Sequence, residues 1–446
     1  MSDGSVPPPE EDPKGSTTKR AATGEEPEAE PRAAHEIEAG ATLTGAIVTT
    51  GRTGWRQALL VPLLAVFTAL VVGALVIVFS DEEALKQWAS FFRDPLGALA
   101  ASWTAVREAY YALLTGALGS PSEIVRSLAS GEIAQIRGAL FPLSETIVTA
   151  TPLILVGLSV AVGFRAGLFN IGAEGQMNVG AIVGSLAGFT LTSLPGPIHL
   201  VVMILASVAG GMVWGAIPGF LKAKTGAHEV ITTIMLNFIA VSLALYLLSA
   251  DLFTRRAEPI ARPVEVAYPH LFGSSLRVHF GIFVALGVAA LVAWLLNRTT
   301  IGFEFRAVGA NPDAARAAGM NPTRTTIAVM TIAGGLAGLA GGNQLASVTP
   351  SLIPGFASGL GFDGIAVALL GRARPAGVVA AAFLFGMLRA GGRTMQATVQ
   401  VPIDIIVVIQ ALVIAFVAAP ALIRAIYRIR AARVAGPEAF AKGWGG

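Results

Sequence analysis

The stretch LILVGLSVAVGFRAGLFNIGAEGQMNVGAIVGSLAGF, residues 153–189, decides the fold, because it sets two apolar runs on either side of a polar, glycine-rich segment. A hydrocarbon core about 30 Å thick needs roughly 20 helical residues, so these runs predict membrane spans over 144–163 and 167–191. Asparagine, glutamate and glutamine at that depth need a protein partner, water or a ligand. The glycines within 167–180 would let the second span break and turn backbone groups toward a cavity.

The composition of the whole chain agrees with a membrane protein. Of its 446 residues 54% are hydrophobic and only 13% are charged, and the mean hydropathy is +0.68. That is more apolar surface than a soluble core could bury. We therefore predict an all-α polytopic membrane protein. The net charge of +3 is small and its basic residues cluster beside the spans, which excludes nucleic-acid binding.

The apolar runs predict about ten transmembrane helices, over 57–79, 144–163, 167–191, 199–220, 228–250, 278–296, 324–346, 359–371, 376–391 and 402–423. An even number puts both chain ends on one side. Short loops on that side and the C-terminal end carry Lys222, Lys224, Arg298, Arg306, Arg316, Arg372, Arg374, Arg424, Arg428, Arg430 and Arg433. The positive-inside rule makes this side the cytoplasm. The sequence therefore predicts a multi-pass protein of the plasma (inner) membrane with cytoplasmic N and C termini.

The chain is predicted to have three parts. Residues 1–50 are rich in Pro, Glu, Gly, Ser and Thr and carry no cleavable signal pattern, which predicts a disordered cytoplasmic tail. A transmembrane domain is expected over 51–430, with an outer loop over 80–143 and a cytoplasmic loop over 297–323. Residues 431–446 are expected to form a cytoplasmic C-terminal tail.

The outer loop leaves one alternative open at residues 96–118. Arg107 and Glu108 lie at the centre of this segment, and apolar residues recur at helical spacing at Leu96, Leu99, Trp103, Val106, Tyr110 and Leu113. We predict an amphipathic helix on the outer surface. The alternative is an eleventh span, which would place the arginine-rich loops on opposite sides of the membrane.

Ten spans divide into two halves of five with inverted topology. GLFNIG at 167–172 and GLGFDG at 359–364 open the third span of each half. Paired, glycine-interrupted segments at corresponding places are where such transporters bind substrate. The sequence therefore predicts a 5+5 inverted repeat with glycine-broken helices and a small-molecule path between the two breaks.

The candidate residues of this path are Phe169, Asn170, Glu174, Gln176, Asp363, Met395 and Gln396. An alternative role is structural, because polar side chains also join helices to one another in lipid. For Glu174 a structural pairing is favoured, with a cation such as Arg165 as the expected partner. Three glycine ladders, at 180/184/188, 211/215/219 and 334/338/342, predict helices that approach one another closely.

The cytoplasmic loop RAVGANPDAARAAGMNPTR, residues 306–324, predicts a helix of two turns. Asn311 suits the N-cap, Pro312 the first helical position and Asp313 the positive end of the helix dipole, while Gly319 can end the helix. So short a helix gains little stability alone. It therefore implies a partner surface against which it docks.

The sequence lacks the residues and motifs that several kinds of chemistry require. It has no cysteine and no Gly-Lys pair, so it lacks thiol chemistry and the usual ATP-phosphate cradle. No H-E-x-x-H or G-x-S-x-G motif occurs. We predict no catalytic residue and no metal site, and hence a protein that is not itself an enzyme.

Four strings together resemble one family: GLFNIGAEGQ, GAHEVITTIMLNFIA, VGANPDAARAAGM and GFDGIAVALLGR. They are similar to the permeases of binding-protein-dependent ABC importers, in the group that serves ribose and branched-chain amino acids, and most similar to its nucleoside branch. The resemblance runs from about residue 140 to 423. It implies that 51–430 is a permease domain.

The resemblance also implies the partners. A substrate-binding protein outside the membrane would deliver a nucleoside or related sugar, and two permease chains, identical or homologous, would form the path. Two cytoplasmic ATP-binding subunits would hydrolyse ATP-Mg, so that this chain needs no cofactor. The coupling helix would be formed by Asn311, Pro312, Asp313, Ala314, Ala318 and Gly319. The alternatives are a secondary transporter that uses Glu174 and Asp363 for ion coupling, and an accessory membrane scaffold.

Overall fold

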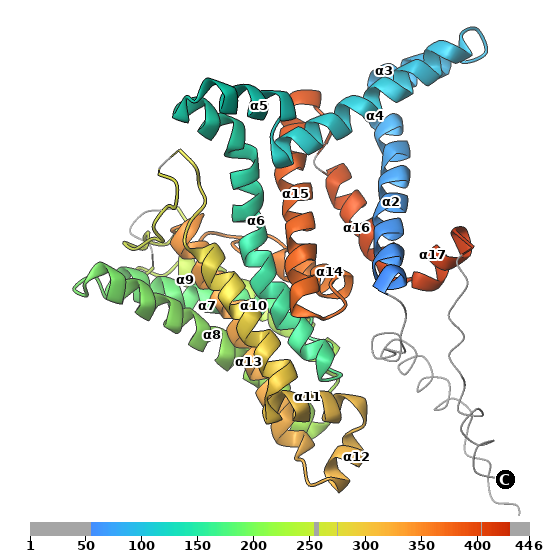
Figure 1. Ribbon diagram of the computed structural model, residues 1–446. Helices are drawn as coiled ribbons and strands as arrows, with labels where there is room; N and C mark the ends of the chain where they lie inside the picture. The colour runs from blue at the N-terminus through green and yellow to red at the C-terminus, as the bar shows by residue number, and fades with distance from the viewer. Residues whose placement is uncertain (1–54, 254–257, 274, 403, 429–446) are drawn as a thin grey trace, which may run out of the picture. The chain divides into compact units, whose positions relative to one another are not determined.

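The structure is a computed structural model that describes residues 55–253, 258–273, 275–402 and 404–428 (Figure 1). The two predicted tails lie outside the described residues. Within these ranges the chain is helical, and its only β pairing is an isolated bridge between His270 and His279. The helices are α2 (Trp55–Ser80), α3 (Glu82–Ala89), α4 (Pro95–Leu118), α5 (Pro121–Ser130), α6 (Ile133–Arg165), α7 (Ala173–Thr190), α8 (Gly196–Thr225), α9 (Glu229–Leu248), α10 (Gly281–Arg298), α11 (Thr300–Ala310), α12 (Pro312–Ala317), α13 (Pro322–Ser347), α14 (Leu360–Leu370), α15 (Pro375–Val399), α16 (Asp404–Ala418) and α17 (Pro420–Ile426).

The all-α polytopic prediction is confirmed, with seven or eight helices of the described chain long and apolar enough to span where about ten were predicted. Seven helices of the described chain are long and apolar enough to cross a membrane: α2, α6, α8, α9, α10, α13 and α15. An eighth span results if α16 and α17, which meet at 89°, are taken as one. The predicted span 167–191 begins with irregular chain and continues as the more polar α7. The predicted span 359–371 is the 11-residue α14, which is shorter than the roughly 20 helical residues that a membrane needs.

The break between α6 and α7 is made by local backbone chemistry. Gly167 has φ +69°, and its N–H donates to the Phe164 carbonyl while the N–H of Leu168 donates to that of Gly163. This is the glycine-ended Schellman turn that stops a helix. The chain then runs as a loop to Gly172, and α7 begins at Ala173. In the second predicted half Gly359, with φ +76°, precedes α14.

The helix packing is reciprocal between the two predicted halves. α6, the second predicted span of the first half, packs on α14 and α15, which are the third and fourth of the second half. α13, the second span of the second half, packs on α7 and α8 in the same way, and α6 and α13 also touch each other. In Figure 1, α6 and α13 cross with α7, α8 and α14 beside them. Each predicted half thus packs its second span on the third and fourth spans of the other half. The 5+5 inverted repeat stays a prediction.

The glycine ladders lie where helices touch, as predicted. A Cβ on Gly334 would overlap the carbonyl oxygen of Gly211, and one on Gly215 would overlap that of Met330. A Cβ on Gly180 would overlap Cα of Gly338. α8, α13 and α7 therefore meet backbone to backbone, which is how small residues let helices associate in lipid.

The outer segment contains α4, whose bounds match the predicted amphipathic helix. α4 is not among the seven candidate spans. Its second half packs on α15 and α6, whereas Leu96, Leu99 and Trp103 in its first half are exposed (Figure 1). An orientation of α4 along the outer membrane surface stays a prediction.

Candidate functional site

The two amides of the α6–α7 break bind each other. Nδ2 of Asn170 donates to Oε1 of Gln176 at 3.0 Å, and Nε2 of Gln176 donates to Oδ1 of Asn170 at 3.2 Å. The same Asn170 oxygen accepts the N–H of Gly172 at 3.0 Å. Asn170 is 0% exposed and Gln176 is 1% exposed. Both predicted path residues thus have hydrogen-bond partners within the protein.

Asn237 of α9 makes two hydrogen bonds to the same break, although it was not predicted from the sequence. Its Nδ2 donates to the Ile171 carbonyl at 3.0 Å, and its Oδ1 accepts the N–H of Gly175 at 2.8 Å. An asparagine inside the apolar string ITTIMLNFIA is costly in lipid without partners. That cost was the signal that could have identified it.

Glu174 joins the broken segments of the two halves. Its Oε1 accepts the N–H of Gly359 at 3.0 Å and its Oε2 that of Gly361 at 2.7 Å. A carboxylate there caps the positive end of α14. The structural pairing of Glu174 was expected, but the expected cation is wrong. Arg165 instead donates its Nε–H to the Ala373 carbonyl at 2.9 Å. Glu174 needs no cation because the free N–H groups at the start of α14 bond its carboxylate.

Asp363, in the first turn of α14, pairs with Arg389 of α15. The guanidinium Nη2 lies 2.7 Å from a carboxylate oxygen, and the two side chains are 28% and 16% exposed, Arg389 first. Arg389 was not selected from the sequence, although a lone arginine within an apolar span indicates a nearby acidic partner. Glu174 and Asp363 therefore both have partners within this chain, two backbone N–H groups for Glu174 and a guanidinium for Asp363.

The other three candidate path residues are placed differently. The Phe169 side chain is 39% exposed, and its ring centroid lies 5.1 Å from that of Phe164. Met395 is fully buried in a separate cluster with residues of α2, α4 and α16, and Gln396 beside it is exposed. The structure thus brings Phe169, Asn170, Glu174, Gln176 and Asp363 to the two breaks. It places Met395 in another cluster and leaves Gln396 exposed beside it.

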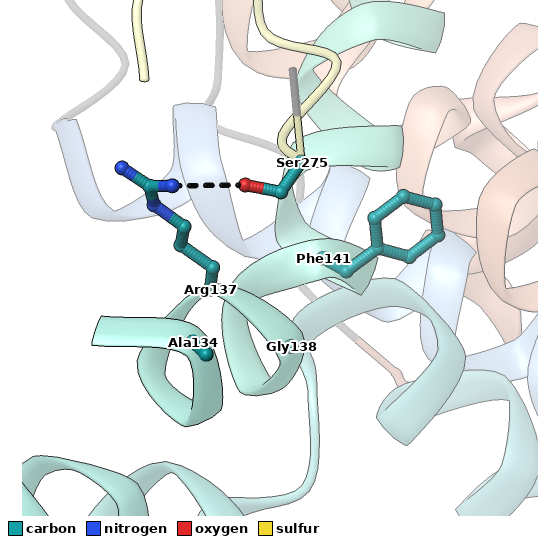
Figure 2. Close-up of a pocket in the computed structure, with 5 residues that line it drawn as sticks. All are labelled: Ala134, Arg137, Gly138, Phe141 and Ser275. Atoms are coloured by element: carbon teal, nitrogen blue, oxygen red, sulfur yellow. Dashed lines mark hydrogen bonds between the residues drawn. The ribbon is translucent and has the colours of Figure 1, made fainter. Parts of the chain in front are cut away.

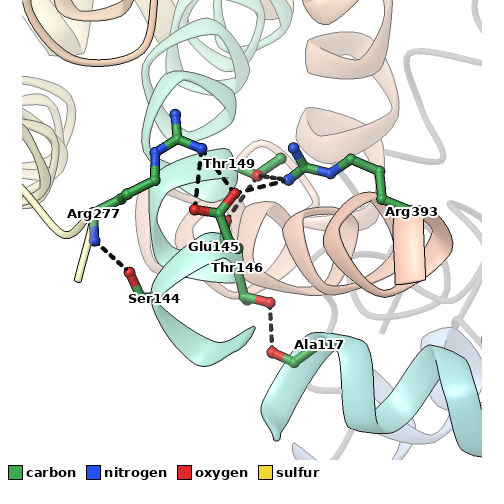
Figure 3. A network of polar contacts seen from close by, with 7 residues as sticks. All are labelled: Ala117, Ser144, Glu145, Thr146, Thr149, Arg277 and Arg393. Carbon is green, nitrogen blue, oxygen red and sulfur yellow. Dashed lines mark hydrogen bonds and ion pairs between the residues drawn. The ribbon is translucent and has the colours of Figure 1, made fainter. Parts of the chain in front are cut away.

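A second polar network lies near the start of the predicted span in α6 (Figure 3). Glu145 receives Nη1 of Arg277 at 3.1 Å and Nη2 of Arg393 at 3.4 Å, so that it links α6 to the segment before α10 and to α15. The Glu145 side chain is 13% exposed, and the arginines are 40% and 52% exposed. Ser144 accepts the N–H of Arg277, and Thr146 donates to the Ala117 carbonyl. Sequence analysis selected none of these residues.

Two hollows adjoin this network and share Phe141. A cavity of about 290 Å³ is lined by Gly116, Phe141, Pro142, Glu145, Ala390, Arg393, Thr394 and Ala397. A more open one of about 630 Å³ is lined by Ala134, Arg137, Gly138, Phe141 and Ser275 (Figure 2). There Nη1 of Arg137 donates to Oγ of Ser275 at 3.3 Å. In the predicted topology this is the outer side.

The segment before α10 also buries a histidine. The ring of His279 stacks on that of Tyr268, with centroids 5.7 Å apart and planes 9° apart. Its Nδ1 accepts the N–H of Gly281, so Nε2 carries the proton of the neutral ring. His279 lies two residues before Gly281, the first residue of α10. Burial, together with the nearby His270 and Arg277, lowers its pKa to about 4.

The helix predicted within the loop 306–324 is present as α12. Asn311 caps it, because its Oδ1 accepts the N–H groups of Asp313 and Ala314, each at 3.0 Å. Pro312 is its first residue, and Gly319, with φ +85°, follows its last turn. Ala315 is the one residue buried within Pro312–Ala317. The side of α12 that carries Ala314 and Ala318 is exposed.

Comparison with known proteins identifies the family of this chain. A family model described as branched-chain amino acid transport system / permease component matches residues 143–433. The chain is 37% identical over 373 residues to the guanosine ABC transporter permease protein NupP of Bacillus subtilis, an alignment that covers 82% of this chain and 94% of NupP. No solved structure matches.

For two further relatives the alignment covers a smaller share of this chain. The nucleoside ABC transporter permease protein NupB of Lactococcus lactis is 35% identical, with 63% of this chain and 80% of NupB aligned. The glucose ABC transporter permease protein TsgB13 of Haloferax volcanii is 38% identical, with 62% of this chain and 76% of TsgB13 aligned. With the family model covering most of the described helices, this chain belongs to the permease-component family of ABC transporters.

Proposed function

We propose that this permease imports nucleosides, or related sugars, into the cell. The observation that carries the proposal is the 37% identity to a guanosine permease along nearly the whole of that relative. A nucleoside permease and a glucose permease are further relatives, which keeps related sugars within the proposal. Nucleosides and sugars are neutral, and Glu174 and Asp363 at the breaks already have bonding partners within the chain.

The proposed path runs between the breaks at 166–172 and 348–359. Phe169 offers a half-exposed aromatic face there. The Asn170–Gln176 pair offers amide donors and acceptors that a hydroxyl or a base edge can replace one for one. Met395 and Gln396 contribute to the path only if it passes the cluster of α2, α4 and α16.

The proposed complex contains further subunits. Cytoplasmic ATP-binding subunits would dock on α12 and hydrolyse ATP-Mg, because α12 is a short, capped and exposed helix that gains little stability alone. A substrate-binding protein would dock on the opposite face, and a second permease chain, identical or homologous, would complete the path. This orientation requires cytoplasmic N and C termini in the plasma membrane.

The ion-coupled alternative lacks a supporting observation. Such a carrier needs a carboxylate that is free to bind a proton or cation inside the bundle. Glu174 accepts two backbone N–H groups, and Asp363 pairs with Arg389. Neither side chain is available without a rearrangement of α14.

The test is transport in proteoliposomes by this chain assembled with candidate ATPase subunits and a candidate substrate-binding protein. We expect saturable, ATP-dependent uptake of radiolabelled nucleoside. Glucose and leucine serve as competing substrates. ATP-dependent uptake of leucine alone would refute the nucleoside assignment, and uptake driven by a proton gradient without ATP would refute the ABC mechanism.

A further inference from the structure

The end of α11 touches the α6–α7 break through backbone alone. A Cβ on Gly309 would lie 2.5 Å from the carbonyl carbon of Ala166 and 2.7 Å from the nitrogen of Gly167. From the other side, a Cβ on Gly167 would lie 2.9 Å from the carbonyl oxygen of Gly309. No side chain stands between the two segments. A displacement of one is therefore passed to the other without rotamer changes that could absorb it.

This contact lies immediately beside α12. Gly309 is two residues before Asn311, the N-cap of α12, and the N–H of Asn311 donates to the Ala307 carbonyl at 3.0 Å. α11 thus continues into the cap of α12 without a flexible linker. A partner that moves α12 also moves Gly309.

The break in turn holds both ends of α14. Glu174, which follows the break, caps the N-terminus of α14 through Gly359 and Gly361. Arg165, which precedes the break, donates to the Ala373 carbonyl in the turn after α14. Arg372 and Ala373 in that turn have φ of 54° and 50°, a left-handed backbone that non-glycine residues adopt at a cost. The surrounding contacts therefore define the position of this turn.

We propose that the Gly167–Gly309 contact carries movement of α12 into the α6–α7 break, and that Arg165 and Glu174 carry this movement on to α14. Gly309, Gly167 and Arg165 are positioning residues in this relay, since they touch neither substrate nor nucleotide. The relay rests on the proposed function, because an ATPase subunit must move α12. It explains how one short helix reaches both predicted halves of the path.

The test uses Gly309→Ala, with Gly341→Ala as a matched control. A Cβ on Gly341 would also meet a backbone atom at 2.5 Å, the carbonyl oxygen of Met177, but at the crossing of α13 and α7. Both glycines lie within helices. The native chain has no cysteine, so Ile171→Cys places a single reporter inside the break. Its rate of maleimide labelling is measured in the assembled complex with and without a non-hydrolysable ATP analogue.

In the Ile171→Cys background we expect the nucleotide to change the labelling rate, and Gly341→Ala to keep that change. Gly309→Ala should retain the ATPase subunits but lose the change and about tenfold or more of the uptake, since a shift of about 1 Å is costly to a positioned group. A preserved nucleotide response in Gly309→Ala, or its loss in both variants, overturns the relay.

Arg165→Lys keeps the charge but loses the Nε donor, so it tests the relay even if Gly309→Ala fails to insert. We expect uptake to fall while the nucleotide still changes labelling at position 171, because Arg165 acts after the break. Unchanged uptake overturns this step. If the Ile171→Cys chain without a second substitution binds ATPase subunits and transports but shows no labelling change, the relay alone is wrong. If it binds no ATPase subunit, the proposed function fails as well.

Discussion

Glu174 accepts a 2.7 Å hydrogen bond from the backbone N–H of Gly361, a residue 187 positions later in the chain. The bond connects the first turn of α7 with the first turn of α14, and so links the two predicted halves at their breaks. A negative charge there is favoured by the free N–H groups and the dipole of α14. Glu174 is 8% exposed.

Glu174→Gln should destabilise the protein by about 1.5–3 kcal/mol, the value of a hydrogen bond to a charged group. Glutamine keeps the size but offers one acceptor oxygen where the carboxylate offers two. Thermal melting of the purified chain in detergent measures the loss. Glu108→Gln, on the exposed face of α4, is the control. Equal melting temperatures for both variants would contradict the capping role.

The Asn170–Gln176 pair gives a prediction that separates a path from a scaffold. Asn170→Leu or Gln176→Leu leaves one buried amide without its partner, at a cost of roughly 0.6 kcal/mol per lost bond in a membrane. The double variant removes both polar groups and should be more stable than the sum of the single losses predicts. Uptake should stay low in all three variants if the pair lines the path. Normal uptake with lowered melting temperatures would leave the pair a structural role only.

Ala314→Glu together with Ala318→Glu should abolish binding of the ATPase subunits and uptake, because both alanines lie on the exposed side of α12. Membrane insertion and melting temperature should not change, since the cap at Asn311 is untouched. Co-purification of the ATPase subunits measures the effect. Ala129→Glu, at an exposed alanine of α5, is the matched control. Retained ATPase binding in the double variant would remove the coupling role of α12.

Glu145→Gln should lower stability by about 1 kcal/mol, because it leaves Arg277 and Arg393 near each other without their shared carboxylate. The expected loss of stability is small because the two guanidinium groups are 40% and 52% exposed to solvent. Salt screens such charges, so the difference from the unsubstituted protein should shrink between low and 1 M salt. Melting temperatures at the two salt concentrations check this. A difference that does not depend on salt would point to packing rather than charge.

His279 predicts a loss of stability in mild acid. Its pKa of about 4 in the folded protein lies below the usual value near 6.5, so the unfolded chain binds the extra proton first. The stability is complete above about pH 6.5 and falls as the pH drops toward 4, by roughly 2 kcal/mol at pH 5. Melting at pH 7.5 and 5 measures the fall. His279→Asn should reduce this difference, and an equal fall in the variant would assign it to other groups.

Local sequence chemistry was enough to predict α12, because its cap, first proline and terminal glycine act on their own neighbours. Hydropathy likewise identified the apolar helices. It could not distinguish a full span from a loop followed by a helix, which is the case at 167–191, where α7 begins only at Ala173. The residues at the breaks were found because polar groups at membrane depth are rare.

Their partners could not be predicted in the same way. Gly361 as the partner of Glu174, Arg389 as that of Asp363, and the Arg277–Glu145–Arg393 network all depend on which helices pack together. Composition and spacing carry no such information. Arg165 shows the consequence, because a cation nearby in sequence was expected to pair with Glu174 and instead binds a carbonyl of another turn.

The backbone contact of α8 with α13 limits how this protein can move. Helices slide past each other by small side-chain readjustments at their interface, and at Gly211 and Gly334 there is no side chain to readjust. These two helices should therefore travel as one rigid body between conformations. Shear must occur where side chains mediate the contact, as between α6 and α14, where Val156 and Val367 face the glycines of the other helix.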